Sequence, residues 1–425
     1  MAVLKAFRGI RPIKDQVAKI VSRPYDVLNR TEAFGEAKGN PLSFLHVVKP
    51  EIDLPESTDE HDPEVYRKGN ENFQKMIADG LFFSDDKEKL YVYAQTMAGR
   101  TQYGIVGCAS VDDYQNHVIL KHELTRPDKE EDRKNHIRVS NVNYEPVFFA
   151  YPAVDEIDEI VANITAIPAE YDFTTNDDIR HQFWVISDAV VIGRIIELFA
   201  AIPNTYVADG HHRTAAAAHV GEERRKASSN HTGNEEYNFF LAVHFPDNQL
   251  KIFDYNRVVK DLNGRSETEF LKELEKVFAV QCKGTDEYRP ATLHELSMYL
   301  GGKWYVLKAQ PGTYNDDDPI GCLDVTILSE LVLAPLLDIT DLRVSKRIDF
   351  IGGIRGLGEL KQRVDSGEMA AAFTLYPVSM KQLINIADTG NIMPPKTTWF
   401  EPKLRSGLVV YSLSPDPSPA EGGAC

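Results

Sequence analysis

The stretch that decides the fold runs from residue 206 to residue 214 and reads Tyr-Val-Ala-Asp-Gly-His-His-Arg-Thr, with four alanines after it. An apolar strand end enters a turn at Gly210, and glycine adopts backbone angles that are closed to other residues. The alanines that follow favour a helix. Because the first N–H groups of a helix lack partners within it and carry the positive end of its dipole, we expect an anion site at this turn.

The polar residues of this stretch suit phosphate chemistry. Arg213 offers a forked donor that matches phosphate oxygens, and Asp209 at the lip of the turn suits a magnesium ion or a proton. His211 and His212 do not have the spacing of two metal ligands on one helix face, which disfavours zinc. The simpler interpretation is a capped helix with exposed polar residues. Four chemically active residues within five positions favour a functional site.

Two further clusters are candidates for chemistry. Residues 121–125 read Lys-His-Glu-Leu-Thr and follow a short apolar strand at 118–120. A loop there can turn an imidazole, a carboxylate and a hydroxyl to one pocket, where Glu123 suits a general base. Residues 395–398 read Pro-Lys-Thr-Thr and offer one charge and two hydroxyls on a stiff segment. The alternatives are a solvated loop for the first cluster and a simple turn for the second.

Composition limits the class of protein. The chain has 425 residues, of which 43% are hydrophobic and 26% charged, with a net charge of −17. This is typical of a soluble globular protein of two or three domains and disfavours a nucleic-acid or membrane partner. We find no apolar run long enough for a transmembrane helix and no signal peptide. The four cysteines lack metal or disulfide spacing, so we expect a cytoplasmic protein with reduced thiols.

Short strands interleave with helices along the chain, which predicts an α+β fold. We expect an N-terminal α+β region over 1–112, a catalytic core over 113–260, a C-terminal α+β domain over 261–413 and a disordered tail over 414–425. A glycine-rich segment at 352–358 lacks the lysine-serine ending of a phosphate-binding loop and is interpreted as a strand-to-helix connection. Helices are predicted at 63–80, 126–139, 155–166, 189–201, 267–278, 324–337, 358–366 and 379–389. Strands are predicted at 89–96, 101–111, 118–120, 146–151, 183–187, 206–208, 236–245, 249–255, 303–307, 350–353, 370–375 and 407–413.

Taken in order, these motifs resemble a known family. His-Glu at 122–123, Ala-Asp-Gly-His-His-Arg at 208–213 and Pro-Lys-Thr-Thr at 395–398 are similar to motifs of the free serine kinase family, which has a ParB/sulfiredoxin-like nucleotide-binding fold. That resemblance covers roughly residues 116–405. The chain also resembles the DUF1015 family, whose longer members carry an Arg-Pro-Tyr-Asp-Val like residues 23–27. The first 110 or so residues have no counterpart in the short kinases and would cap the site or form a dimer.

The resemblance implies a role for each motif. It implies Glu123 as the general base for the serine hydroxyl, with Asp209 and His212 as further catalytic residues and Asp209 as the ligand of Mg²⁺. It implies that ATP or ADP contacts the rest of the turn, namely Gly210, His211, Arg213 and Thr214. It implies that the small substrate contacts His122, Thr125, Tyr255, Lys396, Thr397 and Thr398. A tryptophan of the kinases is replaced by Tyr255 and a histidine by Phe400, which leaves the exact substrate open.

These roles imply a nucleotide-dependent phosphotransferase of serine metabolism that acts on free L-serine or O-phosphoserine. A phosphoserine-hydrolysing enzyme and a non-catalytic nucleotide-binding switch remain as alternatives. A role in DNA partitioning is disfavoured, because the sequence shows no helix-turn-helix and no basic stripe. The phosphate donor, the direction of the reaction and a possible homodimer stay open.

Overall fold

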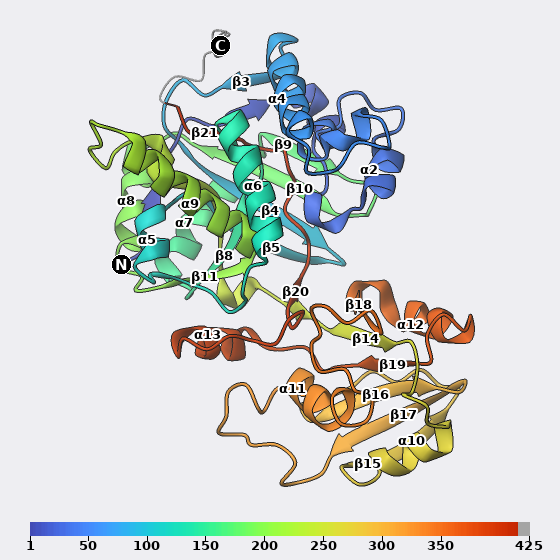
Figure 1. Ribbon diagram of the computed structural model, residues 1–425. Helices are drawn as coiled ribbons and strands as arrows, with labels where there is room; N and C mark the ends of the chain where they lie inside the picture. The colour runs from blue at the N-terminus through green and yellow to red at the C-terminus, as the bar shows by residue number, and fades with distance from the viewer. Residues whose placement is uncertain (415–425) are drawn as a thin grey trace. The chain divides into compact units, whose positions relative to one another are not determined.

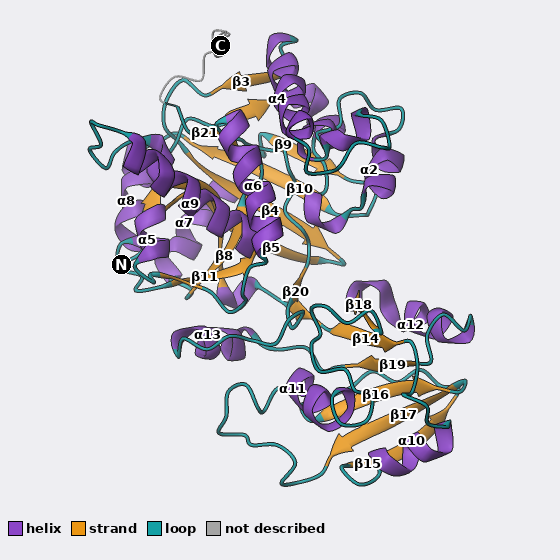
Figure 2. Ribbon diagram, in the orientation of Figure 1, coloured by secondary structure: helices purple, strands orange, loops and turns teal. Residues whose placement is uncertain are grey.

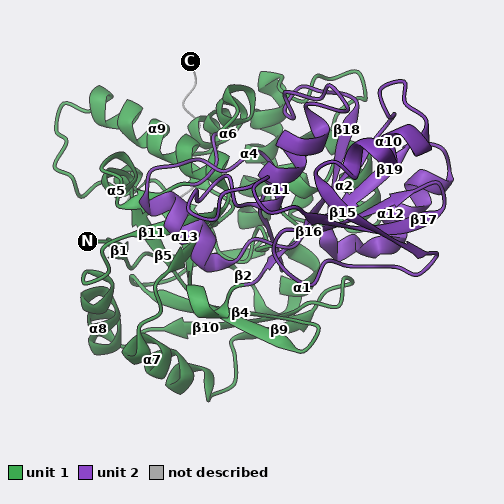
Figure 3. Cartoon of the chain, turned by 90° about the horizontal axis from the view of Figure 1, so that it is seen from below, with its two compact units in different colours: residues 1–121, 125–250, 402–425 green, residues 122–124, 251–401 purple. Residues whose placement is uncertain are grey.

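The protein was analysed as a computed structural model, which describes residues 1–414, so the tail expected at 414–425 lies outside the described residues except for Ser414. The chain divides into two compact units (Figure 3). Unit 1 comprises residues 1–121, residues 125–250 and the C-terminal segment from 402. Unit 2 comprises residues 122–124 and 251–401. Unit 2 is thus mostly one long insertion into the chain of unit 1.

Unit 1 is built on a mixed sheet, which is nine-stranded within residues 1–414 (Figure 1). The main path of this sheet runs β6 (Ile119–Leu120), β11 (Thr205–Asp209), β8 (Val147–Tyr151), β12 (Phe239–Pro246), β5 (Arg100–Ser110), β4 (Leu90–Met97), β10 (Arg180–Ile186) and β9 (Tyr171–Thr174), with β1 (Leu4–Lys5) beside β5. β11 is parallel to β6, and β12 is parallel to β8. The expected regions 1–112 and 113–260 therefore contribute strands to one sheet.

The long helices of unit 1 agree with the sequence pattern. They are α4 (Pro63–Ala78), α6 (Pro127–Ser140), α7 (Asp155–Thr165), α8 (Ala189–Phe199) and α9 (His211–Ala227). Unit 1 also has short helices that the sequence pattern did not predict, namely α1 (Val17–Ile20), α2 (Arg30–Ala37), α3 (Leu45–Val48) and α5 (Val111–Gln115). Proline occupies the first turn of α4 and of α6, where its missing N–H costs nothing. α6 packs against α9, the helix that begins with the two histidines.

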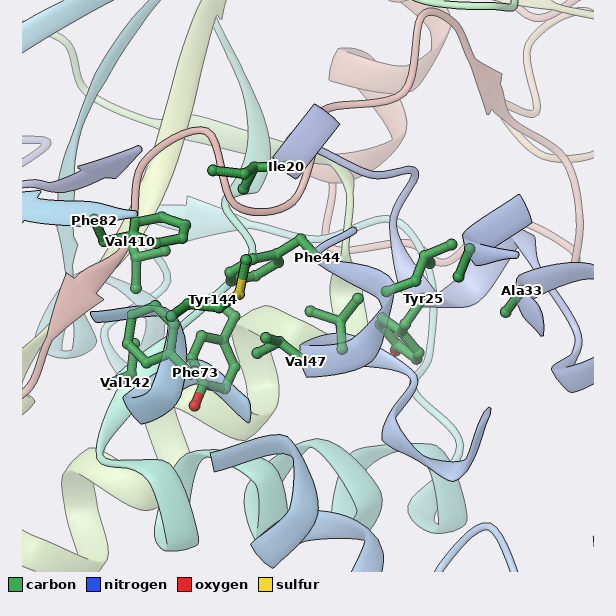
Figure 4. Packing of buried hydrophobic residues seen from close by; sticks show 14 of the residues in the cluster. Ile20, Tyr25, Ala33, Phe44, Val47, Phe73, Phe82, Val142, Tyr144 and Val410 are labelled. Carbon is green, nitrogen blue, oxygen red and sulfur yellow. The ribbon is translucent and has the colours of Figure 1, made fainter. Parts of the chain in front are cut away.

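A cluster of buried apolar residues ties the N-terminal region to the rest of unit 1 (Figure 4). Phe44 and Phe73 from the N-terminal region lie 5.8 and 5.0 Å from Tyr144, measured between ring centroids. Phe82 packs against the same two phenylalanines at 5.8 and 5.5 Å. Val410, from the C-terminal segment, belongs to the same cluster. Residues from the start, the middle and the end of the chain thus share one core, so the N-terminal region is part of unit 1.

Unit 2 contains a second, antiparallel sheet. Its order is β15 (Phe278–Gly284), β17 (Lys303–Ala309), β16 (Glu295–Leu300), β19 (Ala371–Thr374), β14 (Tyr255–Val259) and β18 (Ile348–Gly352). Its helices are α10 (Glu267–Leu274), α11 (Asp324–Leu328), α12 (Gly356–Asp365) and α13 (Met380–Asp388). A two-stranded ladder pairs β13 (Ile252–Phe253) with β20 (Trp399–Phe400).

Helices and strands mix in both units, which confirms the α+β class (Figure 2). Two differences from the expected elements stand out. The helix expected over 324–337 is α-helical only as far as Leu328 and continues as a π-helix over Ser329–Leu333. The last strand shortens to β21 (Tyr411–Ser412), which pairs with β7 (Val142–Asn143). Within residues 1–414, no helix combines the length and the apolar character that a bilayer crossing requires.

A close approach within α9 yields a stability prediction. A Cβ added to Gly221 would lie 2.5 Å from the carbonyl oxygen of Tyr237 and 3.0 Å from Val111, so one of them must shift. We expect Gly221→Ala to lower the free energy of unfolding by about 1–3 kcal/mol, as overpacking does. The matched control is Gly193→Ala in α8, where no atom lies within 4 Å of the new Cβ. That variant should gain about 0.5–1 kcal/mol from helix propensity. Equal thermal midpoints for the two variants would contradict this packing.

Candidate functional site

The strand, turn and helix expected around Gly210 are present. β11 shifts register against β8 between Val207 and Asp209, so a bulge bends the strand just before the turn. Gly210 is the N-cap of α9 and has φ 91° and ψ 33°, in the left-handed region. α9 is 17 residues long, and its positive dipole end lies at this turn. The local geometry is therefore that of an anion-binding helix start.

Arg213 lies beneath this turn. Its side chain is 7% exposed, and its Nη1 donates to the carbonyl oxygen of Pro146 at 2.6 Å. Its Nη2 donates to Asp209 Oδ2 at 3.3 Å and lies 3.5 Å from Asp26 Oδ2. Burial alone would lower the pKa of Arg213, but the carboxylates of Asp26 and Asp209 outweigh it and raise that pKa. The guanidinium of Arg213, which was expected to bind a ligand phosphate, thus already contacts groups of the protein itself.

Asp209 is ionised by its surroundings. Burial opposes its charge, but Lys403 and Arg213 outweigh this effect and lower the pKa of Asp209 to about 2. Lys403 Nζ lies 3.4 Å from Asp209 Oδ1. Lys403 comes from the C-terminal segment, nearly 200 residues after the turn. Both carboxylate oxygens of Asp209 therefore contact cations of unit 1.

The two histidines and Thr214 differ in their surroundings. Burial lowers the pKa of His211 to about 4, so this ring is neutral at pH 7. His212 is half-buried, and its Nε2 accepts a hydrogen bond from the amide of Arg126 at 3.0 Å, which places a ring proton on Nδ1. Thr214 is fully buried, and its hydroxyl donates to the carbonyl oxygen of Gly210 at 3.0 Å. Thr214 thus stabilises the turn from within.

Unit 2 brings two of the expected clusters together. The amide of Met393 donates to the carbonyl oxygen of His122 at 2.8 Å, and the side chain of His122 lies 3.2 Å from Thr398, measured from Nε2 to Oγ1. Thr397 is buried, and its hydroxyl donates to the carbonyl oxygen of Pro394 at 2.6 Å, which stiffens the loop. The loop over 394–398 and the His-Glu pair thus share one unit, although 270 residues separate them in sequence.

Two cationic side chains, Lys396 and Arg257, lie at the loop over 394–398. Lys396 is exposed and has φ 59°, and its Nζ lies 5.9 Å from the ring centroid of Tyr255. Arg257, on β14, is 1% exposed and donates from Nη2 to the carbonyl oxygen of Lys396 at 2.9 Å. Within residues 1–414, no carboxylate oxygen lies within 4.0 Å of a side-chain nitrogen of Lys396 or Arg257. Burial lowers the pKa of Arg257 to about 10.

The remaining expected residues are also placed. Glu123 is half-buried and belongs to unit 2, whereas Asp209 belongs to unit 1, so their proximity stays a prediction. Thr125 belongs to unit 1, and its hydroxyl donates to Glu130 at 3.0 Å. In the glycine-rich connection, a Cβ on Gly352 would lie 2.7 Å from the ring of Trp399. That glycine therefore provides room for an aromatic ring.

A metal ion does not fit Asp209 as the structure stands, because both of its oxygens already contact Lys403 and Arg213. Within residues 1–414, no group of three or more His, Cys, Asp or Glu side chains is placed to hold a metal ion. A cavity of about 40 Å³ lies beside Arg213 and is lined by Arg133 and Glu145. Small-molecule sites usually measure about 300–1,000 Å³, so this cavity is too small for a nucleotide.

Three residues of the site escaped the sequence-based prediction. Lys403 and Arg257 carry no local signal, because each meets its partner only after the chain has folded. Asp26 stands in the Arg-Pro-Tyr-Asp-Val segment, which was noticed as a family feature without a role. The only sequence signal for Arg257 is a charge within the run Tyr-Asn-Arg-Val-Val over 255–259, whose other residues are uncharged.

The depressed pKa of Asp209 predicts a pH dependence of stability. A carboxylate with pKa about 2 in the fold and 3.8 unfolded stabilises the fold fully above pH 3.8. This contribution, on the order of 2 kcal/mol, is lost as pH falls through 2. We therefore expect Asp209→Asn to be less stable than the parent at pH 7. The difference in stability between the two proteins should shrink as the pH falls from 4 to 2. Thermal unfolding of both proteins across this range measures the gap, and a gap that stays constant would contradict the ion pairs.

Comparisons with known proteins place the chain in a family. A family model described as "Protein of unknown function (DUF1015)" matches residues 4–326. No curated protein shows a significant match.

Similar solved structures include free serine kinase in complex with AMP, at 11% identity and TM-score 0.32, over 70% of this chain and 86% of that chain. They include SbnI with a C-terminal truncation from Staphylococcus aureus, at 14% identity and TM-score 0.35, over 70% and 82%. A conserved hypothetical protein from Pyrococcus furiosus is similar at 13% identity and TM-score 0.33, over 70% and 90%. Because the family model spans well over half of its residues, the chain belongs to the DUF1015 family.

Proposed function

We propose that this protein is a nucleotide-dependent phosphotransferase of the ParB/sulfiredoxin-like fold that acts on free L-serine or O-phosphoserine in serine metabolism, with ATP or ADP as the nucleotide. The observation that carries the proposal is the left-handed turn at Gly210 between β11 and the 17-residue helix α9. Such a turn presents amide groups and a helix dipole to an anion. The three sequence motifs shared with the free serine kinases supply the reaction class.

The contacts of Arg213 refine how a nucleotide phosphate would bind. Because the guanidinium already contacts Pro146, Asp209 and Asp26, we assign it to the support of the turn. Recognition of the phosphate then falls to the first amide groups of α9, which have no acceptor within the helix. His212 is half-buried at the same helix start, and we assign it to assist.

The cations of unit 2 support an anionic small substrate. Lys396 and Arg257 carry two positive charges, and no carboxylate lies within the 4.0 Å limit of an ion pair from either within residues 1–414. Of the two, Arg257 is buried, and a buried charge without a carboxylate partner is costly, so a ligand with a negative group would compensate the charge of Arg257. Free serine and O-phosphoserine both carry a carboxylate. Lys396 would contact that group as a point charge, and Thr398 would hydrogen-bond the polar end of the substrate.

The chemistry assigned to the protein is one proton transfer and the orientation of two substrates. In the forward direction the serine oxygen forms a bond to the terminal phosphorus of the nucleotide, and the bond from that phosphorus to the bridging oxygen breaks. Glu123 accepts the hydroxyl proton, and the shortened nucleotide leaves with the bridging oxygen. The resemblance also implies Mg²⁺ at Asp209. We derive no step through this ion, because Lys403 and Arg213 occupy the carboxylate.

The role of Glu123 predicts a large effect on turnover. Glu123→Gln keeps the shape of the side chain and removes the proton acceptor, so kcat for phosphoserine formation should fall by roughly 10²–10⁴-fold. The measurement is the appearance of phosphoserine from serine with ATP or with ADP in the presence of magnesium. The matched control is Glu159→Gln, at an exposed position of α7, which should keep parental turnover. Full activity of Glu123→Gln would remove the general base from the proposal.

The placement of Thr398 predicts a selective effect on the amino acid. Thr398→Val keeps the volume of the side chain and removes the hydroxyl that lies near His122. We expect KM for serine to rise by roughly 10-fold, the cost of one hydrogen bond, with little change in nucleotide affinity. Thr389→Val, at the exposed end of α13, is the control and should leave both constants unchanged. Parental kinetics for Thr398→Val would reduce the 394–398 loop to a connector.

A further inference from the structure

The Arg-Pro-Tyr-Asp-Val segment at 23–27 takes no part in the function proposed above, yet it packs beneath the Gly210 turn. Pro24 is extended and starts a single 3₁₀ turn over Tyr25–Val27. The amide of Tyr25 donates to Glu145 Oε1 at 3.1 Å. The ring of Tyr25 lies 3.6 Å from the guanidinium carbon of Arg133 and belongs to the buried apolar cluster (Figure 4). These contacts fix the position of the next residue, Asp26.

Asp26 is directed at Arg213. Its Oδ2 lies 3.5 Å from Arg213 Nη2, the nitrogen that also lies 3.3 Å from Asp209 Oδ2. The side chain of Asp26 is 34% exposed, whereas that of Arg213 is 7% exposed. Together with the bond from Nη1 to Pro146, these contacts engage both terminal nitrogens of the guanidinium.

The position of this guanidinium sets the shape of the turn. A Cβ on Gly210 would lie 3.1 Å from both Cζ and Nε of Arg213, so the guanidinium packs directly against the glycine backbone. The φ of Gly210 is 91°, a conformation that side chains rarely permit. A shift of Arg213 would therefore remove the support under the peptide that leads into α9.

Charge balance makes Asp26 more than a packing contact. A guanidinium as buried as that of Arg213 needs a carboxylate partner. Asp209 shares its negative charge between Arg213 and Lys403, because Lys403 contacts its other carboxylate oxygen. Asp26 supplies the second negative charge, and the four groups Asp26, Asp209, Arg213 and Lys403 sum to zero.

We propose that Asp26 is a positioning residue of the phosphate-binding turn: it holds Arg213 beneath Gly210 and so presets the first amide groups of α9 for an anionic phosphate. The N-terminal segment thereby becomes a component of the nucleotide site. This inference rests on the proposed function as far as the identity of the ligand is concerned. The positioning itself is a property of the protein without ligand.

The test uses the full chain with Asp26→Asn, Asp26→Glu and a control, Glu36→Gln. Glu36→Gln removes the carboxylate that pairs with Arg23 in the same region. Titration calorimetry compares ADP with adenosine, which has no phosphate. We expect Asp26→Asn to weaken ADP binding roughly tenfold or more, the scale of a charged hydrogen bond, without a change for adenosine. Asp26→Glu should recover part of the loss, and Glu36→Gln should bind as the parent does.

Hydrogen exchange separates this inference from the proposed function. Without ligand, the amides of residues 210–214 should exchange several-fold faster in Asp26→Asn than in the parent or in Glu36→Gln, because opening of the turn costs less. Parental exchange in Asp26→Asn, with the thermal midpoint retained, would overturn the inference whatever the ligand. Tighter ADP binding by Asp26→Asn would also overturn it, since Asp26 would then compete with phosphate. The parent could also bind neither ADP nor ATP while Asp26→Asn exchanges faster. That result would support the positioning role of Asp26 and contradict the proposed function.

Discussion

The packing of the Arg213 guanidinium against Gly210 is the contact on which the candidate site depends. It demands a residue without a side chain at position 210, and it places a buried positive charge under a left-handed peptide. That charge in turn requires carboxylates, which Asp209 supplies from the strand and Asp26 from the N-terminal region. The start of α9 is therefore supported by the ion pairs of Arg213, and the first amide groups of the helix have no acceptor within it.

The buried arginines of the two units have different partners. In unit 1, Arg213 and Arg133 each lie near two carboxylates, and these clusters stabilise the fold without a ligand. In unit 2, Arg257 is equally buried, but among the residues up to 414 its hydrogen bonds go to carbonyl oxygens and not to a carboxylate. A protein gains nothing in stability from a buried charge that lacks a partner. The difference is the physical basis for assigning an anionic substrate to the loop beside Arg257.

Local pattern predicted much of the fold, and long-range pairing did not follow from it. The β11–Gly210–α9 junction was predicted correctly because its signals are adjacent residues: an apolar run, a glycine and four alanines. The strand expected over 249–255 is not continuous: it covers β13, which pairs with β20, and only the first residue of β14, which pairs with β18 and β19 in unit 2. β9 and β16 escaped prediction because polar residues interrupt their short apolar runs. Lys403 and Asp26 reach Asp209 and Arg213 only through tertiary structure, which no spacing in the sequence encodes.

The return of the chain to unit 1 after residue 401 bears on how the protein is made. Domains generally fold as units while the chain is synthesised from its N-terminus. Unit 1 lacks Val410, Tyr411 and Arg405 until the segment after residue 401 has been synthesised, and all three are buried in it. The pairing of β21 with β7 and the ion pair of Lys403 with Asp209 are therefore completed only after the whole insertion has been translated. The turn at Gly210 lies near the middle of the sequence, yet its ion pair with the C-terminal segment forms only after residue 403 has been added.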